Sequence, residues 1–172
     1  MTRFASSALA TLTAASGLFA LTAGSALADT NVFQARSICV GGTAGATVGT
    51  MTNPSFTTFV NVYCSINRDR TDAKPTLVQV TVVDNSSLLI GDGNFSCNLT
   101  PVSRTGALVG TPGGSAVTTG VNSAGQILTV PIPAAVPTDG TMTLKCKVPR
   151  RGAGDPVSLV ASIKVVEPDP TN

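Results

Sequence analysis

The sequence predicts an all-β domain of antiparallel strands that follows a removable leader, and three observations support this prediction. After residue 28, side chains alternate between apolar and polar with a period of two, the spacing at which a strand turns successive side chains to opposite faces. Clusters of Gly, Asn, Asp and Pro separate the alternating runs and favour turns. The chain also carries four cysteines, and they show no Cys-x-x-Cys spacing.

The leader is predicted from residues 1–28, which read as a signal peptide. Arg3 is the only charged residue before Asp29, and the stretch from Phe4 to Ala26 is rich in Ala, Leu, Ser and Thr. Ala26-Leu27-Ala28 presents small residues at the two positions that signal peptidase reads, so cleavage is expected after Ala28. An uncleaved membrane anchor is the alternative. No later apolar stretch is long enough to cross a bilayer.

The remaining 144 residues suit one domain, predicted over residues 29–166, with a flexible tail over residues 167–172. The predicted strands, in chain order, are Val32–Val40, Phe59–Ile66, Leu77–Val83, Phe95–Thr100, Gln126–Ile132, Thr141–Val148 and Val157–Val165. In the sixth strand Met142, Leu144, Cys146 and Val148 are expected to point inward. In the last strand the inward set is Val157, Leu159, Ala161, Ile163 and Val165. The segment Thr105–Gly125 is either a weak hairpin or a loop.

About seven to nine short strands follow from this spacing of turns. Antiparallel strands with one apolar face must bury it against a second sheet. The sequence therefore predicts an antiparallel β-sandwich with an immunoglobulin-like or related Greek-key layout, and a barrel is the alternative.

The cysteines fit the same pattern, because Cys64, Cys97 and Cys146 each share a face with apolar neighbours. Disulfides are expected in an exported chain. Of the three pairings that four cysteines allow, Cys39–Cys64 with Cys97–Cys146 is favoured, since each bridge then joins neighbouring elements without crossing the other.

Several short motifs resemble a known group of proteins. They are Val62-Tyr63-Cys64, Asn94-Phe95-Ser96-Cys97-Asn98-Leu99 and the late strand ending Cys146-Lys147-Val148-Pro149. Together with Cys39, their order is similar to that in small, uncharacterised, secreted four-cysteine proteins of Gram-negative bacteria. The resemblance implies a bacterial source and a β-rich exported domain, and it implies no activity.

Catalytic chemistry lacks its usual residues here. The chain contains no histidine, which excludes Ser-His-Asp and Cys-His machinery and any histidine-based metal site. Nearly all acidic residues fall in predicted turns or termini. We expect no cofactor, and the sequence favours a protein that is not an enzyme.

Binding residues are easier to nominate. Seven basic residues would form a surface suited to acidic or phosphorylated glycans if their loops meet, and solubilising charge is the alternative interpretation. They are Arg68, Arg70, Lys74, Lys145, Lys147, Arg150 and Arg151. Asp92 and Asn94 could supply oxygen ligands to calcium, although an ordinary hairpin turn is the favoured interpretation. Of the aromatic residues Phe33, Phe56, Phe59, Tyr63 and Phe95, most are expected in the core.

Three functional hypotheses remain. The first is a secreted or periplasmic structural or interaction domain, whose partner is an unknown protein or a cell-surface glycan. The second is a pilin- or adhesin-type subunit that accepts a strand from a neighbour. Asp29–Ser37 is short for a donor strand, and Val157–Val166 supplies a closing strand of the chain's own. A hydrolase is third. Ten basic residues against nine acidic ones after residue 28 give no general attraction to nucleic acid.

Overall fold

The computed structural model describes residues 29–45, 49–68, 73–88, 93–103, 105–136 and 141–168. Predictions made for the leader, for Arg70 and Asp92, and for residues 169–172 lie outside these residues. The helices and strands run in the order β1 Asp29–Gln34, α1 Ala35–Ile38, β2 Cys39–Val40, β3 Thr43–Ala44, β4 Met51–Asn53, β5 Val60–Ile66, β6 Leu77–Asp84, β7 Ser96–Val102, β8 Ala116–Val117, β9 Asn122–Thr129, β10 Thr141–Val148 and β11 Ser158–Glu167.

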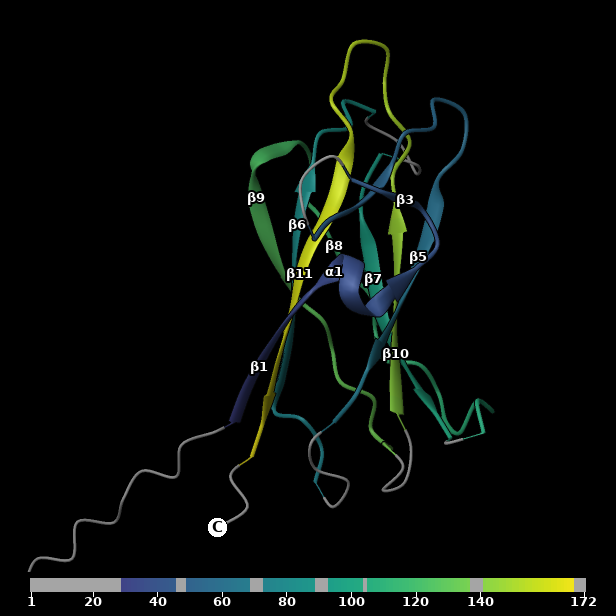
Figure 1. Ribbon diagram of the computed structural model, residues 1–172, viewed down its shortest axis with the longest axis vertical. Coiled ribbons are helices and arrows are strands. Elements are labelled where there is room, and N and C mark those ends of the chain that lie inside the picture. Colours follow the sequence, from purple (N-terminus) through teal and green to yellow (C-terminus); the bar gives the residue numbers. More distant parts are fainter. Residues whose placement is uncertain are drawn as a thin grey trace, which may run out of the picture.

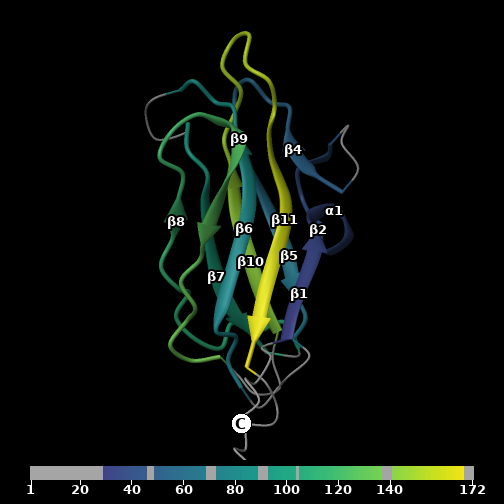
Figure 2. The ribbon, with the colours of Figure 1, turned by 90° about the vertical axis from the view of Figure 1, so that its left-hand side faces the viewer.

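The strands form two antiparallel sheets that pack face to face as a sandwich (Figure 1). The first sheet, which we call sheet A, has the order β3-β4-β11-β6-β9, and β1 pairs with β11 beside β4. The second, sheet B, has the order β2-β5-β10-β7-β8. Figure 2 looks onto β9, β6, β11 and β1 of sheet A, with β7, β10 and β5 behind them. The predicted all-β sandwich is confirmed.

The connections select the related Greek-key layout over the immunoglobulin-like one. From β4 onward the chain pairs as nested hairpins, with β4 beside β11, β5 beside β10, β6 beside β9 and β7 beside β8. This nesting is the arrangement of a jelly roll. In an immunoglobulin domain the last two strands are neighbours in one sheet, whereas β10 and β11 lie in different sheets here.

The predicted first strand, Val32–Val40, is interrupted. The chain leaves sheet A after β1, makes the single helical turn α1 and enters sheet B as β2. Ala35 is fully buried in this turn, and the Ser37 hydroxyl donates a 2.6 Å hydrogen bond to the Gln34 carbonyl. The break therefore lets the chain cross from sheet A to sheet B. The alternation of apolar and polar residues does not predict such a crossing.

The inward face of β10 matches the prediction, because Met142, Leu144, Cys146 and Val148 are all fully buried. The last strand differs. Its pairing with β6 shifts register between Val160 and Ser162, which marks a β-bulge. One extra residue turns the following side chains to the other face. Consequently Ser158 and Val160 point inward before the bulge, where Val157 and Leu159 were expected, while Ile163 and Val165 are buried as predicted.

Strand β11 is hydrogen-bonded on both sides. It pairs with β6 on one side and with β4 and then β1 on the other. The strand also extends through Glu167, which is fully buried and pairs with Asp29, although the sequence suggests a fraying tail from this residue. Among the described residues, the chain thus closes its own sandwich with its final strand.

Candidate ligand-binding face

The outer side of sheet B carries a set of polar and aromatic side chains from its three central strands. Lys145 lies directly opposite Tyr63 on β5 and Asn98 on β7, and Lys147 lies opposite Asn61 and Ser96. Because alternate residues of a strand share a face, these side chains stand together on the side away from the core. We call this surface the β10 face. It comprises Phe59, Asn61, Tyr63, Ser96, Asn98, Thr100, Thr143, Lys145 and Lys147.

Cations lie over aromatic rings along this side of the molecule. The Lys147 ammonium is 4.4 Å from the centre of the Phe59 ring, and the Lys145 ammonium is 5.9 Å from the centre of the Tyr63 ring. Both rings are exposed, Phe59 by 42% and Tyr63 by 41%. Contacts of this kind contribute about 0.5–1 kcal/mol at exposed sites and hold the side chains in a preferred arrangement.

Two shallow hollows adjoin on the β10 face. The first, which we call the polar hollow, has a volume of about 280 Å³ and is lined by Phe59, Asn61, Ser96, Asn98, Lys145 and Lys147. The second, the apolar hollow, has a volume of about 260 Å³ and is lined by Tyr63, Thr100, Val102, Gly106, Leu108, Thr143 and Lys145. Lys145 lines both hollows, so they lie side by side along the sheet.

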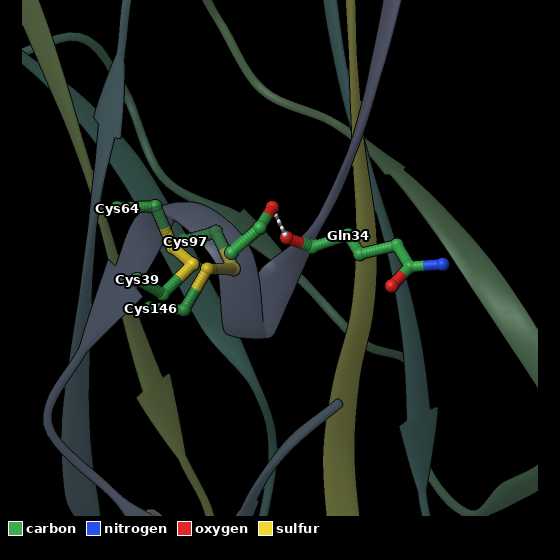
Figure 3. The surroundings of a disulfide bond; sticks show 6 residues. Gln34, Cys39, Cys64, Cys97 and Cys146 are labelled. Carbon is green, nitrogen blue, oxygen red and sulfur yellow. Dashed lines mark hydrogen bonds between the residues drawn. A yellow bond between two sulfur atoms is a disulfide. The ribbon is translucent and has the colours of Figure 1, made fainter. Parts of the chain in front are cut away.

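The backbone beneath this face is fixed by both disulfides. Cys39 is bonded to Cys64 and Cys97 to Cys146, the pairing favoured from the sequence, and each bond joins residues directly opposite in sheet B. Figure 3 shows the two disulfides side by side. Each of the strands β5, β7 and β10 carries one of these cysteines on its inner side. The residues next to that cysteine in the sequence include members of the β10 face on the outer side.

Tyr63 precedes Cys64, and Cys146 stands between Lys145 and Lys147. Cross-linked strands lose little freedom when a ligand binds, so the cystines preorganise the face above them.

A buried amide positions the end of the face that carries Phe59. Asn53 is fully buried, and its Nδ2 donates hydrogen bonds to the carbonyl oxygens of Thr58, Val148 and Pro149 at 2.9, 3.2 and 3.1 Å. Its Oδ1 accepts a 2.9 Å hydrogen bond from the Ser55 N–H. One side chain therefore ties the segment before β5 to the end of β10.

Among the described residues, the charged side chains on the β10 face are Lys145 and Lys147, and the carboxylates lie elsewhere. They belong to Asp29, Asp84, Asp155 and Glu167. Asp84 and Glu167 are buried, and Asp29 lies on β1 in sheet A. Asp155 sits in the loop between β10 and β11, where the N–H of Ser87, its hydroxyl and the N–H of Gly152 lower the pKa of its carboxyl.

The predicted basic residues do not all meet. Lys145 and Lys147 share the β10 face, and Arg150 and Arg151 follow just beyond Val148. Arg151 donates from Nε and Nη2 to the Asp155 carbonyl at 3.0 and 2.8 Å, and its guanidinium lies 4.5 Å from the centre of the Phe56 ring. Arg150 donates to the Phe56 carbonyl at 3.5 Å. These two arginines therefore hold loops together beside the face.

Arg68 and Lys74 lie at the far end of the β5–β10 pair. Val60 of β5 pairs with Val148, whereas Ile66 pairs with Met142, so the segment after β5 is a strand length away from the arginine loop. The two loops occupy opposite ends of the sandwich (Figure 1). Arg68 donates to the Ala73 carbonyl at 3.2 Å, and Lys74 donates to the Ala134 carbonyl. The structure thus separates the seven residues into two groups, with Arg70 outside the described residues.

The sequence interpretation misplaced three aromatic residues. Phe56, Phe59 and Tyr63 are exposed, although most aromatic residues were expected in the core; Phe95 is fully buried and Phe33 packs against the core. For Tyr63 the sequence did contain an indication that the ring is exposed. If Cys64 points inward, then its neighbour Tyr63 points outward on the same strand.

Neither a metal cluster nor a spanning helix is found in the parts of the chain that the structure describes. Within them, no three His, Cys, Asp or Glu residues gather as metal ligands would. Asp92, one half of the proposed calcium pair, lies outside the described residues, and Asn94 follows the same loop. Among the described helices, none has the length and apolar character needed to cross a membrane.

The comparisons with known proteins find similarity to solved structures and none at the level of sequence families. No protein-family model and no curated protein matches the sequence. Among solved structures, the chain is similar to the CBM36-1 domain of a multidomain xylanase from the hindgut metagenome of Trinervitermes trinervoides, with 12% sequence identity and a TM-score of 0.41. The match covers 80% of this chain and 96% of that chain.

Proposed function

We propose that this chain is a secreted or periplasmic interaction domain without catalytic activity, and that its β10 face binds an acidic glycan of a cell surface. The single observation that carries the proposal is the placement of Lys145 and Lys147 among exposed rings, amides and hydroxyls on one rigid sheet face. Two disulfides fit an oxidising compartment outside the cytoplasm.

The chemistry of the face suits a sugar more than a protein segment. Asn61, Asn98 and Ser96 offer both donors and acceptors to hydroxyl groups. The rings of Phe59 and Tyr63 offer apolar surface to the C–H face of a sugar ring. The two ammonium groups attract carboxylate, sulfate or phosphate groups. A shallow open surface, rather than a deep cleft, also matches a polymer that passes over the domain.

Nucleic acid is a weaker candidate for the same charge. Its affinity depends on neutralising many phosphates with basic side chains, and the β10 face presents two lysines. The near balance of eleven basic and nine acidic residues in the whole chain adds no long-range attraction.

Affinity electrophoresis of the purified mature protein tests the proposal. Gels containing polygalacturonate should retard the protein, and 0.5 M salt should release it, because salt screens exposed charges. Gels containing neutral dextran should leave its mobility unchanged. NMR chemical-shift changes should map to the β10 face. The proposal is wrong if neither polygalacturonate nor a sulfated polysaccharide retards the protein, or if the shifts map to sheet A.

A further inference from the structure

We infer that the β10 face recognises two adjacent sugar units of different chemistry, an acidic sugar in the polar hollow and an N-acetylated sugar in the apolar hollow. The inference rests on the proposed function and names its ligand class, a glycan in which hexuronate and N-acetylhexosamine alternate. It is carried by the contrast between the two hollows and by the lysine that they share.

The polar hollow has the composition of a carboxylate site. Lys145 and Lys147 provide two ammonium groups, and the carboxamides of Asn61 and Asn98 lie on the strands at either side of β10. Ammonium groups form charge-assisted hydrogen bonds with a carboxylate, and amides can bind its neighbouring hydroxyls. A carboxylate gains from these ammonium groups an attraction that a neutral sugar does not.

The apolar hollow has a different lining. Tyr63, Val102 and Leu108 surround it with apolar surface, and the hydroxyls of Thr100 and Thr143 stand beside them. Leu108 is 63% exposed, so its side chain is accessible to a bound ligand. An acetamido group presents one methyl to such a surface and one N–H and one carbonyl to the hydroxyls.

Leu108 is held at this position by the backbone. It forms an isolated antiparallel bridge with Val102 of β7. The Ser103 N–H donates to the Ala107 carbonyl at 2.8 Å, and the Val109 N–H donates to the Pro101 carbonyl at 3.2 Å. These bonds fold the segment after β7 back along the strand, so that the leucine forms a wall of the hollow.

The spacing of the two hollows suits consecutive units of one chain. On β10 the polar hollow is lined by Lys145 and Lys147 and the apolar hollow by Thr143 and Lys145, so the two hollows are offset by two residues, about 7 Å along the strand. This is the scale of a single sugar unit. Lys145 borders both hollows, so the hollows are adjacent. A glycan that follows β10 would therefore place an acidic unit in the polar hollow and the next, acetylated unit in the apolar hollow.

Calorimetric titration of the mature protein with three defined oligosaccharides tests the inference. The probes are a hyaluronan hexasaccharide, which alternates the two units, a hexagalacturonate, which is acidic only, and chitohexaose, which is N-acetylated only. We expect the alternating probe to bind at least tenfold more tightly than either of the others.

The variant Leu108→Ser should lower affinity for the hyaluronan hexasaccharide about fourfold, since the contact of one buried methyl is lost. It should leave affinity for hexagalacturonate unchanged. The variant Lys147→Gln should weaken both acidic probes. Lys164→Gln, on the outer side of sheet A, is the matched control and should change nothing. Circular dichroism melting establishes that each variant is folded.

The outcomes separate this inference from the proposed function. If hexagalacturonate binds as tightly as hyaluronan, or if Leu108→Ser leaves hyaluronan binding intact, the two-unit ligand is wrong while binding of acidic glycans stands. If all three probes fail and sulfated polysaccharides fail in gels, both proposals are wrong. Preferential binding of chitohexaose would overturn the assignment of the polar hollow.

Discussion

Lys145 and Tyr63 lie directly opposite each other on neighbouring antiparallel strands, and the lysine ammonium is 5.9 Å from the centre of the tyrosine ring. Their chain neighbours, Cys146 and Cys64, point the opposite way into the core, and each forms a disulfide. The exposed pair of Lys145 and Tyr63 is therefore carried by two strands whose backbones are each fixed by a disulfide.

Replacement of this lysine should weaken binding without harming the fold. Lys145→Gln removes the cation common to both hollows, so affinity for an acidic polysaccharide should fall about tenfold, the value of one hydrogen bond to a charged group. Its remaining affinity should also depend less on salt. Affinity electrophoresis at several salt concentrations measures both effects. Equal loss in Lys164→Gln, where the lysine lies on sheet A, would show that general charge rather than the face is responsible.

Removal of the disulfides should lower stability by unequal amounts. The bridges Cys39–Cys64 and Cys97–Cys146 close loops of 25 and 49 residues. The chain-entropy relation gives about 3.5 and 4 kcal/mol for these loop lengths. Paired Cys→Ala variants measured by denaturant unfolding should show losses of this order, the larger for Cys97 and Cys146.

The unfolding experiment also tests the preorganised face. In the Cys97→Ala, Cys146→Ala variant, hyaluronan affinity should fall under conditions where the protein is still folded, because β7 and β10 carry most of the polar hollow. Unchanged affinity in a folded variant would mean that the cystines stabilise the domain without shaping the site.

Asn53→Asp should be strongly destabilising at neutral pH. The substitution keeps the shape of the side chain but replaces an N–H donor with an oxygen that faces the carbonyls of Thr58, Val148 and Pro149. Loss of a buried donor costs about 1–3 kcal/mol, and a buried charge costs more. Thermal unfolding at pH 7 measures the loss. Acidification should recover part of it by protonating the new carboxyl, and Asn67→Asp at an exposed position after β5 is the control for charge alone.

The stability of the loop between β10 and β11 should depend on acidic pH through Asp155. Its carboxyl accepts hydrogen bonds from the N–H groups of Ser87 and Gly152 at 2.8 and 3.0 Å, and these bonds lower its pKa. A lowered pKa means that the stabilisation is complete above the usual aspartate pKa, about 3.9, and is lost as pH falls through the folded value.

Asp155→Asn should remove this dependence. Unfolding free energies of both proteins between pH 7 and pH 2 should converge as the pH falls. Parallel curves would show that Asp155 does not titrate with folding.

Local alternation in the sequence determined most of the strands and, where no bulge or change of sheet occurs, their faces. It placed β10 at its observed bounds, directed three cysteines inward and, by the same parity, directed Lys145 and Lys147 outward. These features depend only on the two-residue period of a strand, which holds wherever no bulge interrupts the strand.

Which strands became neighbours was decided by the tertiary structure. The β10 face unites residues near positions 60, 98 and 145, and Leu108 joins them through its bridge to Val102. The turn α1 and the bulge in β11 likewise exist because the chain had to change sheets and match a partner's register. Such pairings depend on the free energy gained when the two sheets close over one core. That free energy comes from contacts between residues far apart in the sequence, so the local alternation of side chains cannot predict it.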